Sequence, residues 1–261
     1  MKQTMTVTLM AAALGMLAIP HVYAQPAVTI FSAAGANAEA IQTAVDEFRT
    51  ALGPNNASNV PGDPNGRREI NWDGVAASFS APNNMPPDFF HVNVRRGAVM
   101  AAVAGGGWNG FQVSANEADG PVRFDNHLSG YSSLFTVFSR QKLFASLGNH
   151  VYDVEFKVPG TDTPGSVRGF GVVFANVALE HKSTVEFYSA EGVLLGKLAA
   201  RPAAKGLSFV GGLFPSAMVA RVRITPGTAP LGTVENLEQG INIVVVDDFF
   251  YGEPVNRCVL P

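Results

Sequence analysis

The sequence predicts an all-β fold, an antiparallel sandwich or barrel with one α-helix near the N-terminus. In the second half of the chain, short apolar segments alternate with turn residues at intervals of about 8–16 positions, which is typical of these architectures. The composition agrees with this class. With 27 glycines, 17 prolines and 15% charged residues, the chain suits short strands and many turns better than a helical bundle.

The first regular elements are a strand, Val28–Ser32, and a helix over about residues 37–52. Apolar residues of the helix recur at three- and four-residue intervals and form one stripe: Ile41, Ala44, Val45, Phe48 and Leu52. Asn37 or a residue beside it can cap the helix, and Gly53-Pro54 ends it. We expect the stripe to cover apolar surface at an edge or end of the sheets.

Apolar and alternating segments predict the remaining strands. In the first half these are Arg67–Asp73, Phe89–Val94, Ala98–Val103 and Trp108–Val113. In the second half they are Leu134–Phe138, Val151–Val158, Val167–Phe174, Ser183–Tyr188, Leu194–Ala199, Leu207–Leu213, Val219–Thr225 and Ile241–Tyr251. Hairpins are not stable alone, so the strands must share one core. We therefore expect a single domain over residues 25–255 and a tail over residues 256–261.

Residues 1–24 have the pattern of a secretory signal peptide. A positive start at Lys2 precedes the apolar run Met10–Ile19, and Ala24 is the small residue before the expected cleavage. The run is too short to span a bilayer comfortably, and no second apolar span follows it. We therefore expect a secreted or periplasmic protein that is free of the membrane after cleavage.

Cysteine content and charge narrow the interactions that we expect. Cys258 is the only cysteine, which excludes a disulfide within the chain and predicts either pairing with another chain or an exposed thiol of no consequence. The formal net charge of −3 gives no electrostatic reason to expect nucleic acid as a partner. The sequence does not indicate an oligomeric state.

No known catalytic motif is present in the sequence. It has no G-x-S-x-G nucleophile, no H-x-H or H-E-x-x-H zinc pattern and no phosphate-binding glycine loop. The four histidines after the signal segment are far apart in the sequence: His91, His127, His150 and His181. We therefore assign no catalytic residue.

Acidic residues indicate a calcium site as one hypothesis. Asp247 and Asp248 interrupt an apolar strand, and alternation predicts that they face opposite sides, so that one points toward the core. A buried carboxylate needs a cation, hydrogen-bond donors or a proton. Calcium collects hard oxygen ligands, and Glu69, Asn71 and Asp73 lie on one side of a predicted strand.

The alternative to calcium is purely structural. In this interpretation Asp73 only shapes the turn before Gly74. The aspartates of the last strand then pair with arginines, for which the sequence offers three candidates: Arg67, Arg68 and Arg168.

Aromatic and amide residues in or beside loops indicate a carbohydrate-binding surface. Sugars are bound by aromatic faces together with amide and carboxylate groups, and loops on a rigid scaffold often carry such groups. The candidate ligand-binding residues are Trp108, Asn109, Asn126 and Tyr131. Trp72 lies in an alternating segment and is expected in the core instead.

Five segments in a fixed order resemble a group of exported, largely uncharacterised bacterial proteins that often carry a C-terminal PEP-CTERM sorting segment. The segments are Arg168–Phe174, Val185–Gly192, Leu207–Gly211, Ala220–Ile224 and Val246–Pro254. The resemblance covers most of the chain after residue 24 and implies a jelly-roll-like β-sandwich, a fold class in which calcium is often held between the first and last strands. The sequence ends at Pro261 without an apolar helix and basic tail, so we expect release rather than surface sorting.

Three functions follow as expectations. The first is an exported, non-catalytic binding or structural module, for extracellular polysaccharide and with a structural calcium ion. The second is a secreted carbohydrate-active enzyme, a glycoside hydrolase or lyase that uses acidic residues; Asp247 and Asp248 on opposite faces make a poor pair for it, which leaves Glu155, Glu186 and Glu191. The third is a subunit of a surface or matrix assembly, which would expose an apolar patch or a strand edge.

Overall fold

The computed structural model describes residues 26–118, 120 and 122–256. The predicted signal peptide, residues 1–24, and Cys258 lie outside the described residues. Within the described part of the chain, none of the helices has the length and apolar character that crossing a bilayer requires.

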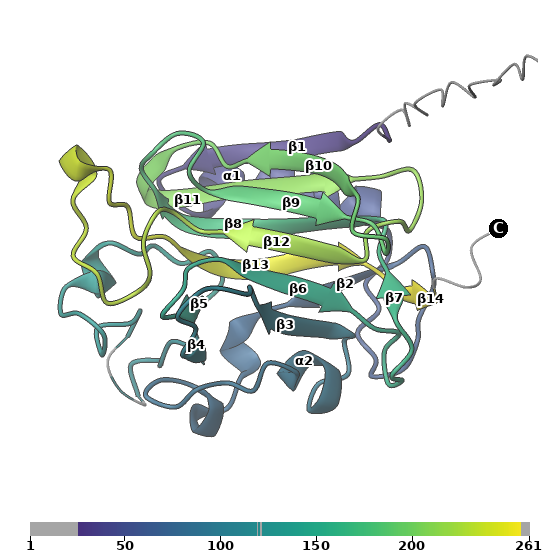
Figure 1. The fold of residues 1–261 in the computed structure, drawn as a ribbon, viewed down its shortest axis with the longest axis horizontal. Coiled ribbons are helices and arrows are strands. Elements are labelled where there is room, and N and C mark those ends of the chain that lie inside the picture. Colours follow the sequence, from purple (N-terminus) through teal and green to yellow (C-terminus); the bar gives the residue numbers. More distant parts are fainter. Residues whose placement is uncertain (1–25, 119, 121, 257–261) are drawn as a thin grey trace, which may run out of the picture.

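Two antiparallel sheets pack together as a sandwich (Figure 1), which confirms the predicted fold class. The larger, 7-stranded sheet has the order β1 (Thr29–Gly35), β11 (Ala203–Leu213), β8 (Gly169–Val177), β13 (Val245–Gly252), β5 (Phe144–Leu147) and β4 (Gly110–Val113), with β2 (Arg67–Ile70) also paired to β13. The 5-stranded sheet has the order β10 (Leu194–Ala199), β9 (Thr184–Tyr188), β12 (Arg221–Thr225), β6 (Tyr152–Phe156) and β3 (Ala98–Ala102). A short pair joins β14 (Val255–Asn256) to β7 (Gly165–Ser166).

The larger sheet is covered on both faces. Its inner face packs on the smaller sheet through a core of aromatic and branched residues, and its outer face packs under the helix and under buried residues of the segment 124–143. Every residue of β8 and β13 is therefore buried. Double burial explains why these two strands read as nearly continuous apolar runs in the sequence.

The predicted helix is confirmed as α1 (Ala38–Leu52), but its position differs from the expectation. Asn37 caps it, since its side chain accepts a hydrogen bond from the backbone N–H of Ala40 at 3.1 Å, and Gly53 ends it at a φ of 94°. The apolar stripe packs on the outer face of the larger sheet, against β1, β11 and β13, and not on an edge or end. The periodicity of the helix shows that it has an apolar face, but it does not show which part of the sheets this face packs on.

Two predicted strands are wrong. Phe89–Val94 begins with a short helix, α2 (Phe89–Val92), because the N–H groups of His91 and Val92 both donate to the carbonyl of Asp88. Leu134–Phe138 is not a strand and follows the 3-10 turn η3 (Tyr131–Ser133). Short apolar runs are ambiguous between helix and strand when only periodicity is used. Conversely, β5 was not predicted.

Two long segments consist mainly of turns and loops, one between β2 and β3 and one between β4 and β5. The predicted strand Arg67–Asp73 ends at Ile70, and two 3-10 turns follow, η1 (Trp72–Gly74) and η2 (Ala77–Phe79). A fourth 3-10 turn, η4 (Leu237–Gln239), precedes β13. Trp72 is fully buried, as expected, and stacks on Phe144 with ring centroids 4.3 Å apart.

Two glycines set how closely α1 approaches the sheet. Gly171 on β8 and Gly211 on β11 are register partners under Phe48 of α1. A Cβ at Gly171 would lie 2.7 Å from Cε1 of Phe48, and a Cβ at Gly211 would lie 3.1 Å from the same ring. The missing side chains therefore make room for the phenylalanine ring.

We expect Gly171→Ala to destabilise the fold by about 1–3 kcal/mol, because the added methyl group overpacks the contact with Phe48. Urea unfolding of the variant measures this loss. Gly107→Ala is the matched control, since a Cβ there meets nothing within 4 Å, and it should stay within about 0.5 kcal/mol of the wild type. Equal stability of the two variants would contradict the packing argument.

Candidate functional site

A β-bulge in β13 separates Val246 from Phe249 by two residues that face a single partner position. Val246 is the register partner of Phe174, and Phe249 is that of Val172, so the ladder shifts between them. Both Val246 and Phe249 lie in the core between the sheets. The two inserted residues are Asp247 and Asp248.

The bulge places the side chains of Asp247 and Asp248 on the same side of the larger sheet, its outer side. Their flanking neighbours Val245 and Phe250 belong to the core under α1. The hydroxyl of Ser139 reaches both carboxyl groups, at 3.1 Å from Asp247 Oδ1 and 2.8 Å from Asp248 Oδ1. The expectation of opposite faces is wrong, because a bulge adds one residue and breaks the alternation on which it rested.

Burial raises the pKa of both carboxyl groups. Asp247 is completely buried and Asp248 is 3% exposed. Loss of hydration raises the pKa of Asp248 to about 6, and it raises that of Asp247 well above its ordinary value, with the charge of Asp248 as a second cause. Ser139 has one hydroxyl proton and donates to one carboxyl at a time. The pair therefore retains a proton at pH values where an exposed carboxyl has lost it.

The arginines considered as partners of these aspartates bond elsewhere. Arg67 donates to Glu69, and Arg168 donates to the carbonyl of Ala51 at 2.7 Å. Arg68 is fully buried and binds Glu253 through two nitrogens, at 2.6 and 2.8 Å. Asp247 and Asp248 instead accept hydrogen bonds from the segment 138–139. One of these donors is the N–H of Phe138, which lies 2.7 Å from Asp247 Oδ2.

The predicted calcium ligands bond to separate partners in the structure and do not surround a common point. Glu69 accepts from Arg67 at 2.7 Å and from Arg49 at 3.0 Å. Asn71 caps the turn by accepting from the N–H of Asp73 at 2.9 Å, and Asp73 accepts from the N–H groups of Gln141 and Lys142. Among the described residues, no three His, Cys, Asp or Glu side chains are arranged to hold a metal ion. Calcium stays a prediction of the sequence.

The predicted sugar-binding residues do not come together either. Tyr131 is 1% exposed in the core on the outer face of the larger sheet and donates its hydroxyl to the carbonyl of Thr233, so its ring has no free face. Trp108 is half-buried and packs against the core between the sheets. Asn126 is exposed and donates to Gln112, and Asn109 is exposed beside Trp108.

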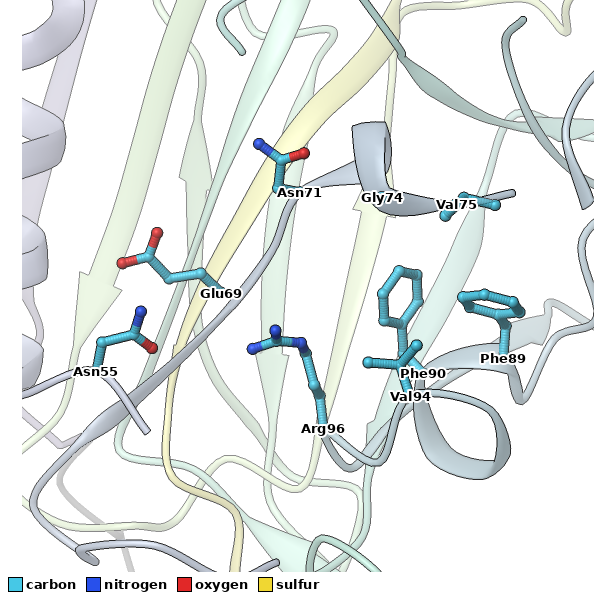
Figure 2. Close-up of a pocket in the computed structure, with 9 residues that line it drawn as sticks. All are labelled: Asn55, Glu69, Asn71, Gly74, Val75, Phe89, Phe90, Val94 and Arg96. Atoms are coloured by element: carbon cyan, nitrogen blue, oxygen red, sulfur yellow. The ribbon is translucent and has the colours of Figure 1, made fainter. Parts of the chain in front are cut away.

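A groove of about 380 Å³, named here the α2 groove, lies between the end of β2 and the short helix α2. Its lining residues are Asn55, Glu69, Asn71, Gly74, Val75, Phe89, Phe90, Val94 and Arg96. Figure 2 shows the polar side chains of Asn55, Glu69 and Asn71 along one side, the apolar residues along the other, and Arg96 between them. Sequence reasoning named only Glu69 and Asn71 of this set.

Three polar groups in the α2 groove have open hydrogen-bonding positions. Among the described residues, none accepts a hydrogen bond from the guanidinium of Arg96, from the amide of Asn55 or from the side-chain nitrogen of Asn71. Glu69 differs, because its carboxylate is held by Arg49 and Arg67. The groove thus presents donors to a ligand, whereas its carboxylate is already engaged.

The apolar wall is closely packed and connects to the bulge. Phe90 packs edge-on against Trp72 and Phe89, with ring centroids 5.5 and 5.1 Å apart. The indole nitrogen of Trp72 donates to the carbonyl of Asp247 at 2.8 Å. The loop that carries Asn55 is also fixed, because Glu253, the partner of Arg68, accepts from Asn56 and from the N–H of Gly62, both at 2.9 Å.

No protein-family model matches the chain, and no curated protein matches it. The structure confirms a mainly-β protein of two packed antiparallel sheets, which is the fold part of the resemblance. The comparisons identify no family.

We expect Asp248→Asn to gain stability relative to the wild type as pH rises. The folded-state pKa of Asp248 is about 6 against an ordinary 3.8, so between these values the folded protein holds more protons than the unfolded chain. Its free energy of unfolding therefore falls with rising pH through this window. The variant lacks this loss. Between pH 4 and pH 7 the free energy of unfolding of the variant, relative to that of the wild type, should therefore rise by about 1–3 kcal/mol.

Urea unfolding of both proteins at a series of pH values measures the difference. Glu238→Gln, at an exposed carboxylate on η4, is the control and should follow the wild type at every pH. A constant difference between Asp248→Asn and the wild type from pH 4 to 7 would show that the pair holds no extra proton.

Proposed function

We propose that this protein is an exported, non-catalytic module that binds extracellular polysaccharide in the α2 groove. One observation carries the proposal: the groove joins an apolar aromatic wall to amide and guanidinium groups with open hydrogen-bonding positions. Ligand sites are typically concave, largely apolar and equipped with a few placed polar groups that fix orientation. The hydroxyl-rich edge and the apolar face of a sugar ring match these two sides.

The size of the groove supports a short stretch of a sugar chain as the ligand. About 380 Å³ is at the lower end of the range for small-molecule sites. Phe89 and Phe90 are 6% and 4% exposed, so they contribute ring edges to the wall rather than broad faces. Most of the specificity then comes from Asn55, Asn71 and Arg96.

The carboxylates favour binding over hydrolysis. A glycoside hydrolase needs two carboxyl groups about 5–9.5 Å apart across the scissile bond. Glu69 is the carboxylate among the groove-lining residues, and two arginines hold it. Glu186, considered as an alternative from the sequence, accepts from Lys197 at 2.7 Å and from Tyr188 at 2.6 Å.

Export is supported by the signal-peptide pattern over residues 1–24. A protein released from the cell or into the periplasm meets polysaccharide as an abundant polymer. The mature chain for every experiment below therefore begins at Gln25.

We expect Asn55→Trp to weaken polysaccharide binding at least about tenfold, because the large side chain fills the groove at an exposed position. The measurement is affinity electrophoresis of the mature protein in gels that contain mannan, xylan, mixed-linkage glucan, alginate or polygalacturonate. Asn59→Trp is the matched control, since Asn59 is an exposed asparagine of the same loop and does not line the groove.

Retardation of wild type and Asn59→Trp, but not of Asn55→Trp, is the expected pattern. Free migration of the wild type in all five polymers would overturn the proposed function. Equal retardation of both variants would place binding outside the α2 groove.

A further inference from the structure

Arg96 is the cation of the α2 groove that lacks a counter-charge. Arg49 and Arg67 share Glu69, and Arg49 also contacts Asp46 at 3.0 Å. Within the described part of the chain, the guanidinium of Arg96 has no ion pair. Arg96 is half-buried as a residue, and a charge beside low-dielectric protein gains more from an anionic partner than a fully exposed one does.

The groove-lining residues include one acidic and one basic side chain, Glu69 and Arg96, and the acidic one is already engaged by two arginines. Glu69 is bound by the guanidinium groups of Arg49 and Arg67, neither of which lines the groove, and Arg49 also bonds to Asp46 on the exposed side of α1. The formal net charge of the chain is −3. Arg96 is therefore the charged side chain of this groove that remains available to an anion, although the chain as a whole is negative.

The backbone holds Arg96 in place before any ligand arrives. Its N–H donates to the carbonyl of Phe90 at 2.9 Å, and its carbonyl accepts from the hydroxyl of Tyr251 at 3.2 Å. Figure 2 shows its side chain rising into the space between Asn55, Asn71 and Phe90. The backbone therefore fixes the position from which the side chain extends, and the planar fork of the guanidinium matches the two oxygens of a carboxylate.

We propose that the α2 groove selects acidic sugars, with Arg96 receiving the carboxylate of a uronic-acid residue while Asn55 and Asn71 bind neighbouring hydroxyl groups. This inference rests on the proposed function and names its ligand class. A sulfate ester on a sugar offers similar oxygens, but a planar carboxylate fits the guanidinium fork in two parallel hydrogen bonds.

The test compares oligogalacturonates with their methyl esters, which keep the sugar ring and remove the charge. Binding to the mature protein is measured by calorimetry, with dextran sulfate and neutral galactan oligosaccharides as further probes. We expect the free acid to bind at least about tenfold more tightly than the methyl ester, and added salt to reduce this ratio.

Arg96→Gln should remove the preference for the free acid, so that acid and ester bind alike. Arg95→Gln is a matched control with the same change of net charge, because Arg95 is exposed and does not line the groove. It should keep the preference within about twofold. Thermal unfolding should be unchanged in Arg96→Gln, since only the backbone of Arg96 bonds to the rest of the described chain.

The outcomes separate the two proposals. Equal binding of acid, ester and neutral galactan at a site blocked by Asn55→Trp would overturn the acidic preference and leave polysaccharide binding intact. Tighter binding of dextran sulfate than of oligogalacturonate would overturn the carboxylate assignment. No binding of these probes by a protein that a neutral polymer still retards would overturn only the acidic preference. No binding of these probes together with free migration in all five polymers would overturn both.

Discussion

The bulge at Asp247 and Asp248 is the constraint on which the rest of the structure depends. β13 lies at the centre of the larger sheet and contributes to two cores at once, so its side chains must alternate correctly along its whole length. The extra residue shifts the alternation of side chains between the two faces in the middle of the strand. On one side of the bulge β13 pairs with β5, and on the other side it pairs with β2. β13 can therefore pair with both β5 and β2 along the same edge.

A bulge in a buried strand leaves polar groups that need partners. The carbonyl of Asp247 receives the indole N–H of Trp72, and the two carboxyl groups receive Ser139 and the N–H of Phe138. These bonds draw the turn after β2 and the segment before β5 onto β13. Because Trp72 then packs edge-on against Phe90, the wall of the α2 groove is positioned by the same irregularity. The site thus lies where the sheet departs from regular pairing.

The sequence predicts the regular parts of this molecule well and its irregular parts poorly. The helix at 37–52, the strand at Leu194–Ala199 and the sandwich itself are confirmed, because periodicity and turn residues are local signals. The common face of Asp247 and Asp248 depends on pairing across strands far apart in the sequence. The α2 groove likewise depends on how 55, 69–75 and 89–96 meet, and only Glu69 and Asn71 stood out beforehand. Doublets such as Phe89-Phe90 and Arg95-Arg96 were the available signal.

One rule separates the structural charges of this protein from those available to a ligand. A buried charge is stable only with a partner or a proton. Arg68 has Glu253 and backbone carbonyls, and the aspartates at the bulge share donors and a proton. The charges and hydrogen bonds of these groups are satisfied within the protein and stabilise the fold. Arg96 is fixed by its backbone yet carries a guanidinium with no partner in the described chain. A charge that is positioned at a groove but not neutralised by the protein is the one that a ligand can neutralise.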